Sequence, residues 1–335
     1  MNNNEFNADA ASLSVDLSEA RQAVKENRFQ DALDLFEIIL ETDPDHIDSL
    51  YLVSVSSRYL KKFDESRKYI ERLLFIAPDM GRAYQELGHI HRDMGNLAKA
   101  AIHYRQACEL NPALLASWNS LYKYFVESKN KPAADHAREQ MEKLQSLPPA
   151  LLYIDQIMNE GRLGIAETQC RAFLKKNPTH TYAMSLLSEI ANRLGYFDDA
   201  EFLLEKAVEF EPKDGELRMK YAQILRKKQK FAKTMEQVNI LCDQYPDNHT
   251  YQAQKASEVM QNGGHEEAIK LLDNILEKNP YNFSTFTSKG HAQKTLGQTD
   301  QAIHSYQSAY KIKPDHGEAF FSLANLKTYS FSANE

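Results

Sequence analysis

The sequence predicts an all-α fold, an α-α superhelix of about nine stacked helix pairs, and three observations support this. Prolines recur every 34 residues, first at Pro44, Pro78 and Pro112 and then from Pro178 to Pro314. The chain of 335 residues has only 12 glycines, and low glycine content with abundant Ala, Leu, Glu, Lys and Gln favours helix. Small and apolar residues recur at helical spacing with the same period. A fixed period of this length indicates tandem helix–turn–helix units.

The period divides the chain into nine repeats and a partial tenth. The repeats begin at Leu13, Ile47, Gly81, Leu115, Leu147, Thr181, Gly215, His249 and Phe283, and the partial one at Gly317. We expect a flexible N-terminus over residues 1–12, repeats one to four over 13–146, repeats five to nine over 147–316, and a partial repeat with a truncated junction over 317–335.

Each repeat carries the same pattern, and the third shows it best. Its marked residues are Tyr84, Leu87, Gly88, His91, Ala100, Tyr104, Ala107 and Pro112. Positions 4, 7, 8 and 11 share one face of the first helix. Small residues at positions 8 and 20 are expected to face each other, so that the paired helices approach closely. Glycine at position 15 is expected to end the first helix, and the closing proline to stop the second. Repeats six and nine are nearly as clear.

This pattern resembles the tetratricopeptide repeat over residues 13 to about 331. The resemblance implies a right-handed solenoid whose first helices line a concave groove and bind partners through positions 2, 5, 9 and 12. We therefore expect a protein or peptide ligand there; the alternative is an inner face that is merely solvated. The predicted groove residues are Arg82, Gln85, His89, Arg92, Asn119, Lys123, Tyr182, Ser185, Glu189, Asn192, Gln223, Arg226, Ser284, Thr287, His291 and Asn325.

Two familiar roles of such repeats do not fit this groove. The chaperone-binding members capture a C-terminal carboxylate with Lys at position 5 and Asn at position 9, a pair that is absent from every repeat. The asparagine ladder of the sugar-transferring members is also missing. Amide and hydroxyl groups can instead hydrogen-bond an extended peptide backbone, and cations can capture acidic groups.

No residue pattern points to catalysis, a cofactor or a metal. Gly263-Gly264 is a lone pair without a phosphate-binding loop. His89 and His91 are two residues apart and point to different helix faces. The cluster from Arg226 to Lys230 ends a first helix, where cations complement the helix dipole. Tyr and Phe recur mostly at positions 4, 17 and 24, and we expect them in the core.

Composition excludes several other classes of protein. With a net charge of −7 and no basic face, binding to nucleic acid is not expected. The apolar runs are far shorter than the roughly 20 residues of a membrane span, and the N-terminus lacks the features of a signal peptide. The three cysteines are scattered and are expected to be reduced. We therefore predict a cytoplasmic location.

The middle of the array is expected to be its weakest part. The interval from Pro112 to Pro178 is two residues short of two periods. Repeat four has Tyr122 where a small residue belongs and Arg138 where an aromatic one belongs, and Pro148 then opens repeat five stiffly. An altered helix angle or a hinge is predicted at repeats four and five.

The end of the sequence suggests a larger protein. The last segment is too apolar for a closing helix, which should be polar outside, and Ser332 to Glu335 forms a capping box. Residues 322–328 with Phe331 and Ser332 resemble the junction in bacterial sulfotransferases that contain these repeats. The resemblance implies a substrate-recruiting region whose catalytic domain lies outside this chain. The alternatives are a free-standing adaptor or assembly scaffold, and a homodimer formed through residues 317–331.

Overall fold

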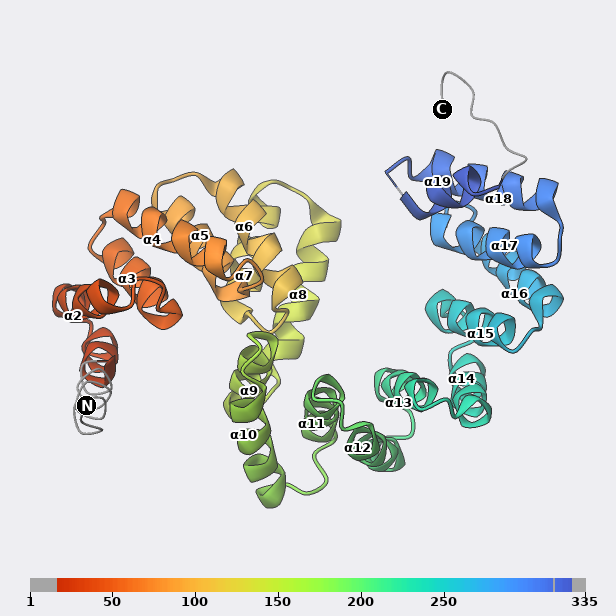
Figure 1. Cartoon of the computed structure of the whole chain (residues 1–335), viewed down its shortest axis with the longest axis horizontal. Coiled ribbons are helices and arrows are strands. Elements are labelled where there is room, and N and C mark those ends of the chain that lie inside the picture. Colours follow the sequence, from red (N-terminus) through yellow and green to blue (C-terminus); the bar gives the residue numbers. More distant parts are fainter. Residues whose placement is uncertain (1–16, 316, 327–335) are drawn as a thin grey trace, which may run out of the picture. The chain divides into compact units, whose positions relative to one another are not determined.

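The computed structural model describes residues 17–315 and 317–326, and all regular secondary structure in this part of the chain is α-helical (Figure 1). The all-α repeat fold is therefore confirmed. The predicted flexible N-terminus, the start of repeat one at Leu13 and the capping box at the C-terminal end lie outside the described residues.

The chain divides into two compact units, Met1–Phe173 and Leu174–Glu335. In the first unit, residues 17–25 are helical and precede α2. The remaining helices of this unit are α2 (Phe29–Thr42), α3 (Ile47–Tyr59), α4 (Phe63–Ile76), α5 (Gly81–Asp93), α6 (Leu97–Leu110), α7 (Leu115–Glu127), α8 (Lys131–Gln145) and α9 (Pro149–Asn159), and α10 (Leu163–Lys176) contains the boundary. The predicted division at residue 147 rests on repeat counting and stays a prediction.

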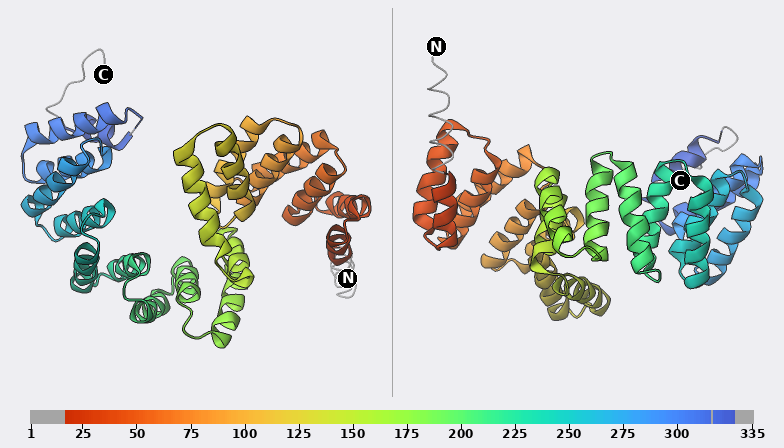
Figure 2. Two further views of the ribbon diagram at one scale, coloured as in Figure 1. Left: turned by 180° about the vertical axis from the view of Figure 1, so that it is seen from behind. Right: turned by 90° about the horizontal axis from the view of Figure 1, so that it is seen from below.

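The second unit continues the same alternation of first and second helices. Its helices are α11 (Thr181–Arg193), α12 (Phe197–Phe210), α13 (Gly215–Lys227), α14 (Phe231–Gln244), α15 (His249–Gln261), α16 (His265–Lys278), α17 (Phe283–Thr295), α18 (Thr299–Ile312) and α19 (Gly317–Ala324). Within each unit, consecutive helices run back and forth beside one another (Figure 2). Within the part of the chain described here, none of the helices has both the length and the apolar character that a membrane crossing requires.

The two residues missing from the 34-residue period are missing from one helix. Helix α9 has 11 residues, whereas α7 and α11 on either side have 13. It begins at Pro149 rather than at the predicted repeat start Leu147, because proline fits the first position of a helix but disfavours helical backbone in the residue before it. The fifth repeat therefore lacks the start of its first helix and keeps its closing turn.

Helix α9 is tied to the end of the third repeat. The Gln156 side chain donates to the carbonyl of Ala113 at 2.9 Å, and the Asn111 side chain donates to the carbonyl of Gln156 at 3.0 Å. Asn111 and Ala113 are both buried. These reciprocal bonds join segments more than 40 residues apart within the first unit.

Every turn between the two helices of a repeat contains one residue in the left-handed region. Five are glycines, as predicted for position 15, with φ from 74° at Gly297 to 87° at Gly263. The other four have side chains: Asn27, Lys61, Lys129 and Gln229, with φ between 56° and 60°. Position 15 therefore imposes a conformation whichever residue occupies it.

The predicted close approach of positions 8 and 20 is confirmed in repeat two. Ser54 donates its hydroxyl to the carbonyl of Ser66 at 2.9 Å, and Ser66 donates its hydroxyl to the carbonyl of Ser54 at 2.7 Å. In repeat three, by contrast, the side chain at position 24 occupies the space beside the small residue at position 8. A Cβ atom added to Gly88 would lie 2.5 Å from the ring of Tyr104.

The prediction that aromatic residues at position 17 lie in the core is wrong for two of them. Phe197 and Phe231 are 38% and 43% exposed. Each is the first residue of its helix, where neighbouring helices cover only one side. Their outer faces instead receive cations, with Lys227 5.8 Å from the Phe197 ring and Arg226 5.8 Å from the Phe231 ring.

Candidate partner-binding site

In the first unit, the predicted groove residue Arg82 is held by the protein itself. Its guanidinium lies 4.9 Å from the centre of the Tyr51 ring and donates to Glu160, the residue that follows α9, at 3.3 Å. Burial raises the pKa of Glu160 more than Arg82 lowers it. Removing one partner of a buried ion pair leaves an uncompensated charge, so Arg82 serves to hold α9 in place.

A second buried ion pair links neighbouring first helices. Arg58 of α3 donates to Glu86 of α5, with 2.5 Å between Nε and Oε1, and to Asp93 at 3.1 Å. Arg58 and Glu86 are both buried. These charges fall at positions 12, 6 and 13. Arg58 therefore lies on the predicted binding stripe itself, but its ion pairs within the unit keep it from a partner.

His89 is in contact with two neighbouring side chains at one ring nitrogen. Its Nδ1 lies 2.7 Å from the hydroxyl of Tyr104 and 3.3 Å from Nη1 of Arg92. Burial and the positive charges of Arg58 and Arg92 lower the pKa of His89 to about 3. His89 is therefore neutral at physiological pH.

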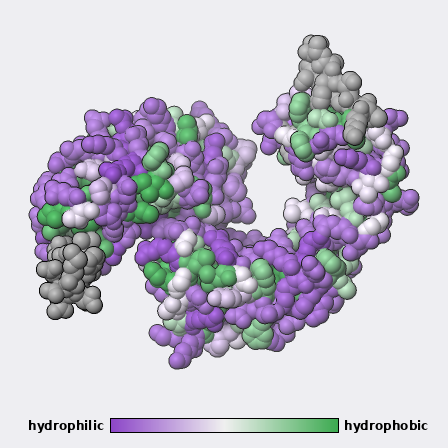
Figure 3. Space-filling view, in the orientation of Figure 1, coloured by the Kyte–Doolittle hydropathy of each residue, from purple (hydrophilic) through white to green (hydrophobic). Residues whose placement is uncertain are grey.

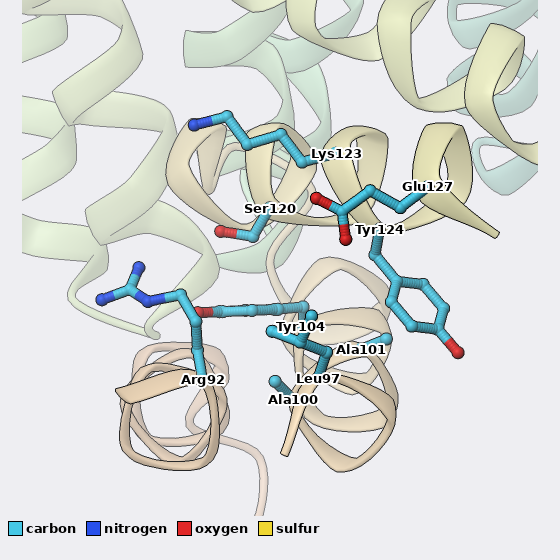
Figure 4. Close-up of a pocket in the computed structure, with 9 residues that line it drawn as sticks. All are labelled: Arg92, Leu97, Ala100, Ala101, Tyr104, Ser120, Lys123, Tyr124 and Glu127. Carbon is cyan, nitrogen blue, oxygen red and sulfur yellow. The ribbon is translucent and has the colours of Figure 1, made fainter. Parts of the chain in front are cut away.

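A pocket of about 200 Å³ opens where α5, α6 and α7 meet (Figure 4). Arg92 and Lys123 approach it from α5 and α7, and Glu127 lies one helical turn beyond Lys123. The remaining lining residues are Leu97, Ala100, Ala101, Tyr104, Ser120 and Tyr124. Two cations and one carboxylate around an apolar wall suit a side chain with an apolar stem and an anionic end.

The other predicted residues of the first unit lie apart from this pocket lining. Asn119 is exposed on α7 and Gln85 is half-buried on α5. The structure thus brings Arg92 and Lys123 together at one pocket, whereas Arg82 and His89 are engaged in contacts within the unit.

In the second unit, several predicted groove residues are paired with the neighbouring repeat. Ser185 accepts from Lys220 at 2.8 Å, and Asn192 accepts from Lys227 at 2.7 Å. Arg226 forms an ion pair with Glu258. Polar groups at these positions therefore join adjacent first helices.

The rest of the predicted set in the second unit is divided between local contacts and solvent. Glu189 pairs with Arg193 at 2.9 Å, and buried Thr287 donates to the carbonyl of Phe283 at 3.0 Å. His291 contacts Tyr306 and Glu318. Tyr182 is half-buried, and the exposed residues are Gln223, Ser284 and Asn325. Polar side chains cover most of the visible face of either unit (Figure 3).

The basic cluster after α13 has a role beyond the predicted interaction with the helix dipole. Lys228 pairs with Asp198 and Glu201 of the preceding repeat, and Lys230 pairs with Glu201 at 2.6 Å. The cluster therefore joins one repeat to the previous one. The sequence alone could not predict this role, because it does not show that Glu201 lies opposite the cluster.

Several residues at the site could not be identified from positions 2, 5, 9 and 12 alone. Glu127 and Tyr124 line the pocket from positions 13 and 10, and Lys220 projects from position 6. Two histidines had a further role: His46 and His180 cap α3 and α11 by accepting a backbone N–H. Among the described residues, no group of three or more His, Cys, Asp or Glu side chains could hold a metal ion.

The geometry defines a class of helical-repeat scaffold, and comparison with known proteins gives the repeat type. Residues 81–114, 182–214 and 283–316 match the family model of the tetratricopeptide repeat. They coincide with the third, sixth and ninth predicted repeats, in which the sequence pattern is clearest. These three segments therefore match tetratricopeptide repeats, which generally mediate protein–protein interaction.

The chain is also similar to individual proteins. It is 26% identical over 134 residues to the tetratricopeptide repeat-containing protein trd-1 of Caenorhabditis elegans, a match that spans 39% of this chain and only 16% of that protein. Among solved structures it resembles YrrB, described as a TPR protein with an unusual peptide-binding site, with 16% identity, a TM-score of 0.44 and coverage of 55% of this chain and 95% of YrrB. It also resembles MamA, with 16% identity, a TM-score of 0.45 and coverage of 49% and 96%.

Proposed function

We propose that this chain is a protein–protein interaction scaffold that binds a peptide or protein partner along its first helices, with the α5–α7 pocket as an anchor point. The observation that supports this most is that Arg92 and Lys123, two exposed cations, line the same partly apolar pocket. Lys123 forms no ion pair within the described part of the chain. Its charge is therefore available to a partner.

Alanine substitution tests the pocket. Lys123→Ala and Arg92→Ala should each weaken partner capture by about tenfold, because each removes one charge-assisted hydrogen bond. Lys123→Ala should leave the melting temperature unchanged, since its side chain is exposed, whereas Arg92→Ala also removes contacts with His89 and Asp93 and should lower it slightly. Lys99→Ala is the matched control, an exposed lysine of α6 that does not line the pocket. Capture that Lys123→Ala and Lys99→Ala affect equally would contradict the proposal.

The role of the scaffold within a larger protein is a second proposal, and a short stretch of sequence supports it. We infer that the scaffold recruits a substrate for a sulfotransferase-like enzyme; this rests on the resemblance of residues 322–328, Phe331 and Ser332. An adaptor without an enzyme domain, acting in the cytoplasm, is the alternative, and the reading frame beyond Glu335 separates the two. In both cases we expect no catalysis by this chain, so sulfate transfer by the chain alone would contradict both.

Self-association through the last helix is a separate proposal. Ala319 and Leu323 of α19 are buried, and Leu323 packs in the same cluster as Tyr306 of α18, whereas Phe321 is 66% exposed. The rest of the predicted dimer segment, residues 327–331, lies outside the described residues. Light scattering should show a dimer that Phe321→Ser weakens, and a strict monomer at all concentrations would contradict it.

A further inference from the structure

The two units contain the same arrangement of a histidine and a buried tyrosine. In the first unit, Nδ1 of His89 lies 2.7 Å from the hydroxyl of Tyr104, and the rings meet at 64°. In the second unit, Nδ1 of His291 lies 2.9 Å from the hydroxyl of Tyr306, and the rings meet at 65°. In both copies a glycine precedes the histidine and leaves room for the tyrosine ring.

The position of the proton on His89 follows from its partners. Arg92 can only donate hydrogen bonds, and its Nη1 lies 3.3 Å from Nδ1 of His89. Nδ1 must therefore be the accepting nitrogen, and the Tyr104 hydroxyl donates to it as well. Because His89 is neutral, the single ring proton lies on Nε2. His89 thus offers an N–H donor from Nε2.

The second copy shows which group accepts a hydrogen bond from such a donor. Nε2 of His291 lies 3.2 Å from the carboxylate of Glu318. Glu318 is the second residue of α19, and the second residue of α7, at the same distance along the chain from His89, is Ala116. The methyl side chain of Ala116 has no carboxylate to place beside His89. Within residues 17–315 and 317–326, the first copy therefore has no carboxylate in the place that Glu318 takes in the second copy.

We propose that the binding partner supplies this carboxylate, so that an acidic side chain of the partner docks on Nε2 of His89 in the place that Glu318 occupies beside His291. This rests on the proposed scaffold function and specifies the chemistry of the ligand. Arg58 and Arg92 both act on the charge state of His89, and Asp93, which pairs with both of them, offsets part of their charge. Lys123 adds a further cation at the adjoining pocket.

The equivalence of Ala116 and Glu318 gives a direct experiment. The Ala116→Glu variant should fill the site from within, because its carboxylate reproduces the spacing of Glu318 from its histidine. Ala116→Gln is the matched control, equal in size and without charge. Ala116 is exposed, so both variants should fold as the original chain does.

Binding is measured by fluorescence polarisation with two labelled peptides, one of repeating Glu-Ala-Ser units and one of repeating Gln-Ala-Ser units. The unmodified full chain should bind the glutamate peptide about tenfold more tightly, as expected for one hydrogen bond to a charged group. Ala116→Glu should abolish this preference and Ala116→Gln should retain it. Reciprocally, Glu318→Ala should expose His291 and add a second site for the glutamate peptide.

The outcomes separate this inference from the scaffold function. Equal binding of both peptides, or equal effects of Ala116→Glu and Ala116→Gln, would overturn the carboxylate assignment. If Lys123→Ala then still weakens partner capture, the scaffold function stands alone. If neither peptide binds, the carboxylate assignment also fails, and the scaffold function is judged on the capture experiment.

Discussion

At the scale of single residues, the strongest constraint is the backbone conformation at position 15. The sequence pattern identifies this position wherever it holds glycine. It could not identify Lys129 or Gln229, because their side chains carry no sign that the backbone there is left-handed. Only the 34-residue spacing, carried across all repeats, places them at the same turn.

This constraint predicts a stabilising substitution. Gln229 has φ of 58°, a conformation that costs a residue with a side chain about 1–2 kcal/mol and glycine almost nothing. Gln229→Gly should therefore raise the free energy of unfolding of the second unit by about 0.5–1 kcal/mol, after the greater freedom of glycine in the unfolded chain is subtracted. Urea denaturation measures the change.

The matched control is Gly195→Ala, at the same position of the preceding repeat. A methyl group there would contact nothing within 4 Å, so its effect reports backbone conformation alone and should have the opposite sign. Destabilisation by Gln229→Gly would show that the Gln229 side chain contributes more than its backbone costs.

At the scale of helices, ion pairs between neighbouring repeats give the second unit a dependence on pH. Burial raises the pKa of Glu201, but hydrogen bonds from Lys228 and Lys230 lower it by more, so the net pKa is below 4.5. A carboxylate with a lowered pKa stabilises the folded state above its unfolded pKa, and this contribution is lost as pH falls through the folded value. Stability should therefore decrease below about pH 4.5.

The Glu201→Gln variant isolates this effect from other carboxylates. At pH 7 it should be less stable than the unmodified chain, and the difference should shrink as the pH is lowered from 4.5 toward 3. Urea denaturation at both ends of this range provides the comparison. A difference that is constant with pH would mean that Glu201 acts through packing and not through its charge.

Helix α9 is the second place where element-scale behaviour can be tested. The predicted hinge at repeats four and five requires amide hydrogens over residues 130–160 to exchange faster than those in the flanking repeats. Gln156→Ala removes the donor to the buried carbonyl of Ala113, which should cost about 1–3 kcal/mol locally and accelerate exchange in α9 further. Exchange in this segment no faster than in repeats two and three would contradict the hinge.

At the scale of the whole molecule, the period alone predicts the repeat fold, because it places a left-handed turn at position 15 of each of the nine repeats. The site is less predictable. Arg82 and His89 occupy positions that face partners in similar proteins, yet Glu160 and Tyr104 engage them here. The contact of Arg82 joins residues 78 apart, and no repeat position encodes it. The contact of His89 lies within one repeat, at positions 9 and 24, and recurs between His291 and Tyr306.

A solenoid also has a measurable size. A compact globule of 335 residues would have a radius of gyration of about 20 Å. From the 34-residue period we expect small-angle scattering from this chain to give a clearly larger value, because most contacts in a repeat array join neighbouring repeats. A radius near 20 Å would contradict the extended array.

The shared histidine–tyrosine arrangement has a consequence for recombination. Residues 81–114 and 283–316 both pair a glycine with a buried tyrosine, and in both the histidine that contacts the tyrosine lies within the same segment. A chain in which these two segments are exchanged should therefore still satisfy both tyrosines. The exchange would, however, leave Arg58 and Glu160 without their partners Glu86 and Arg82, so it should fold with lower stability.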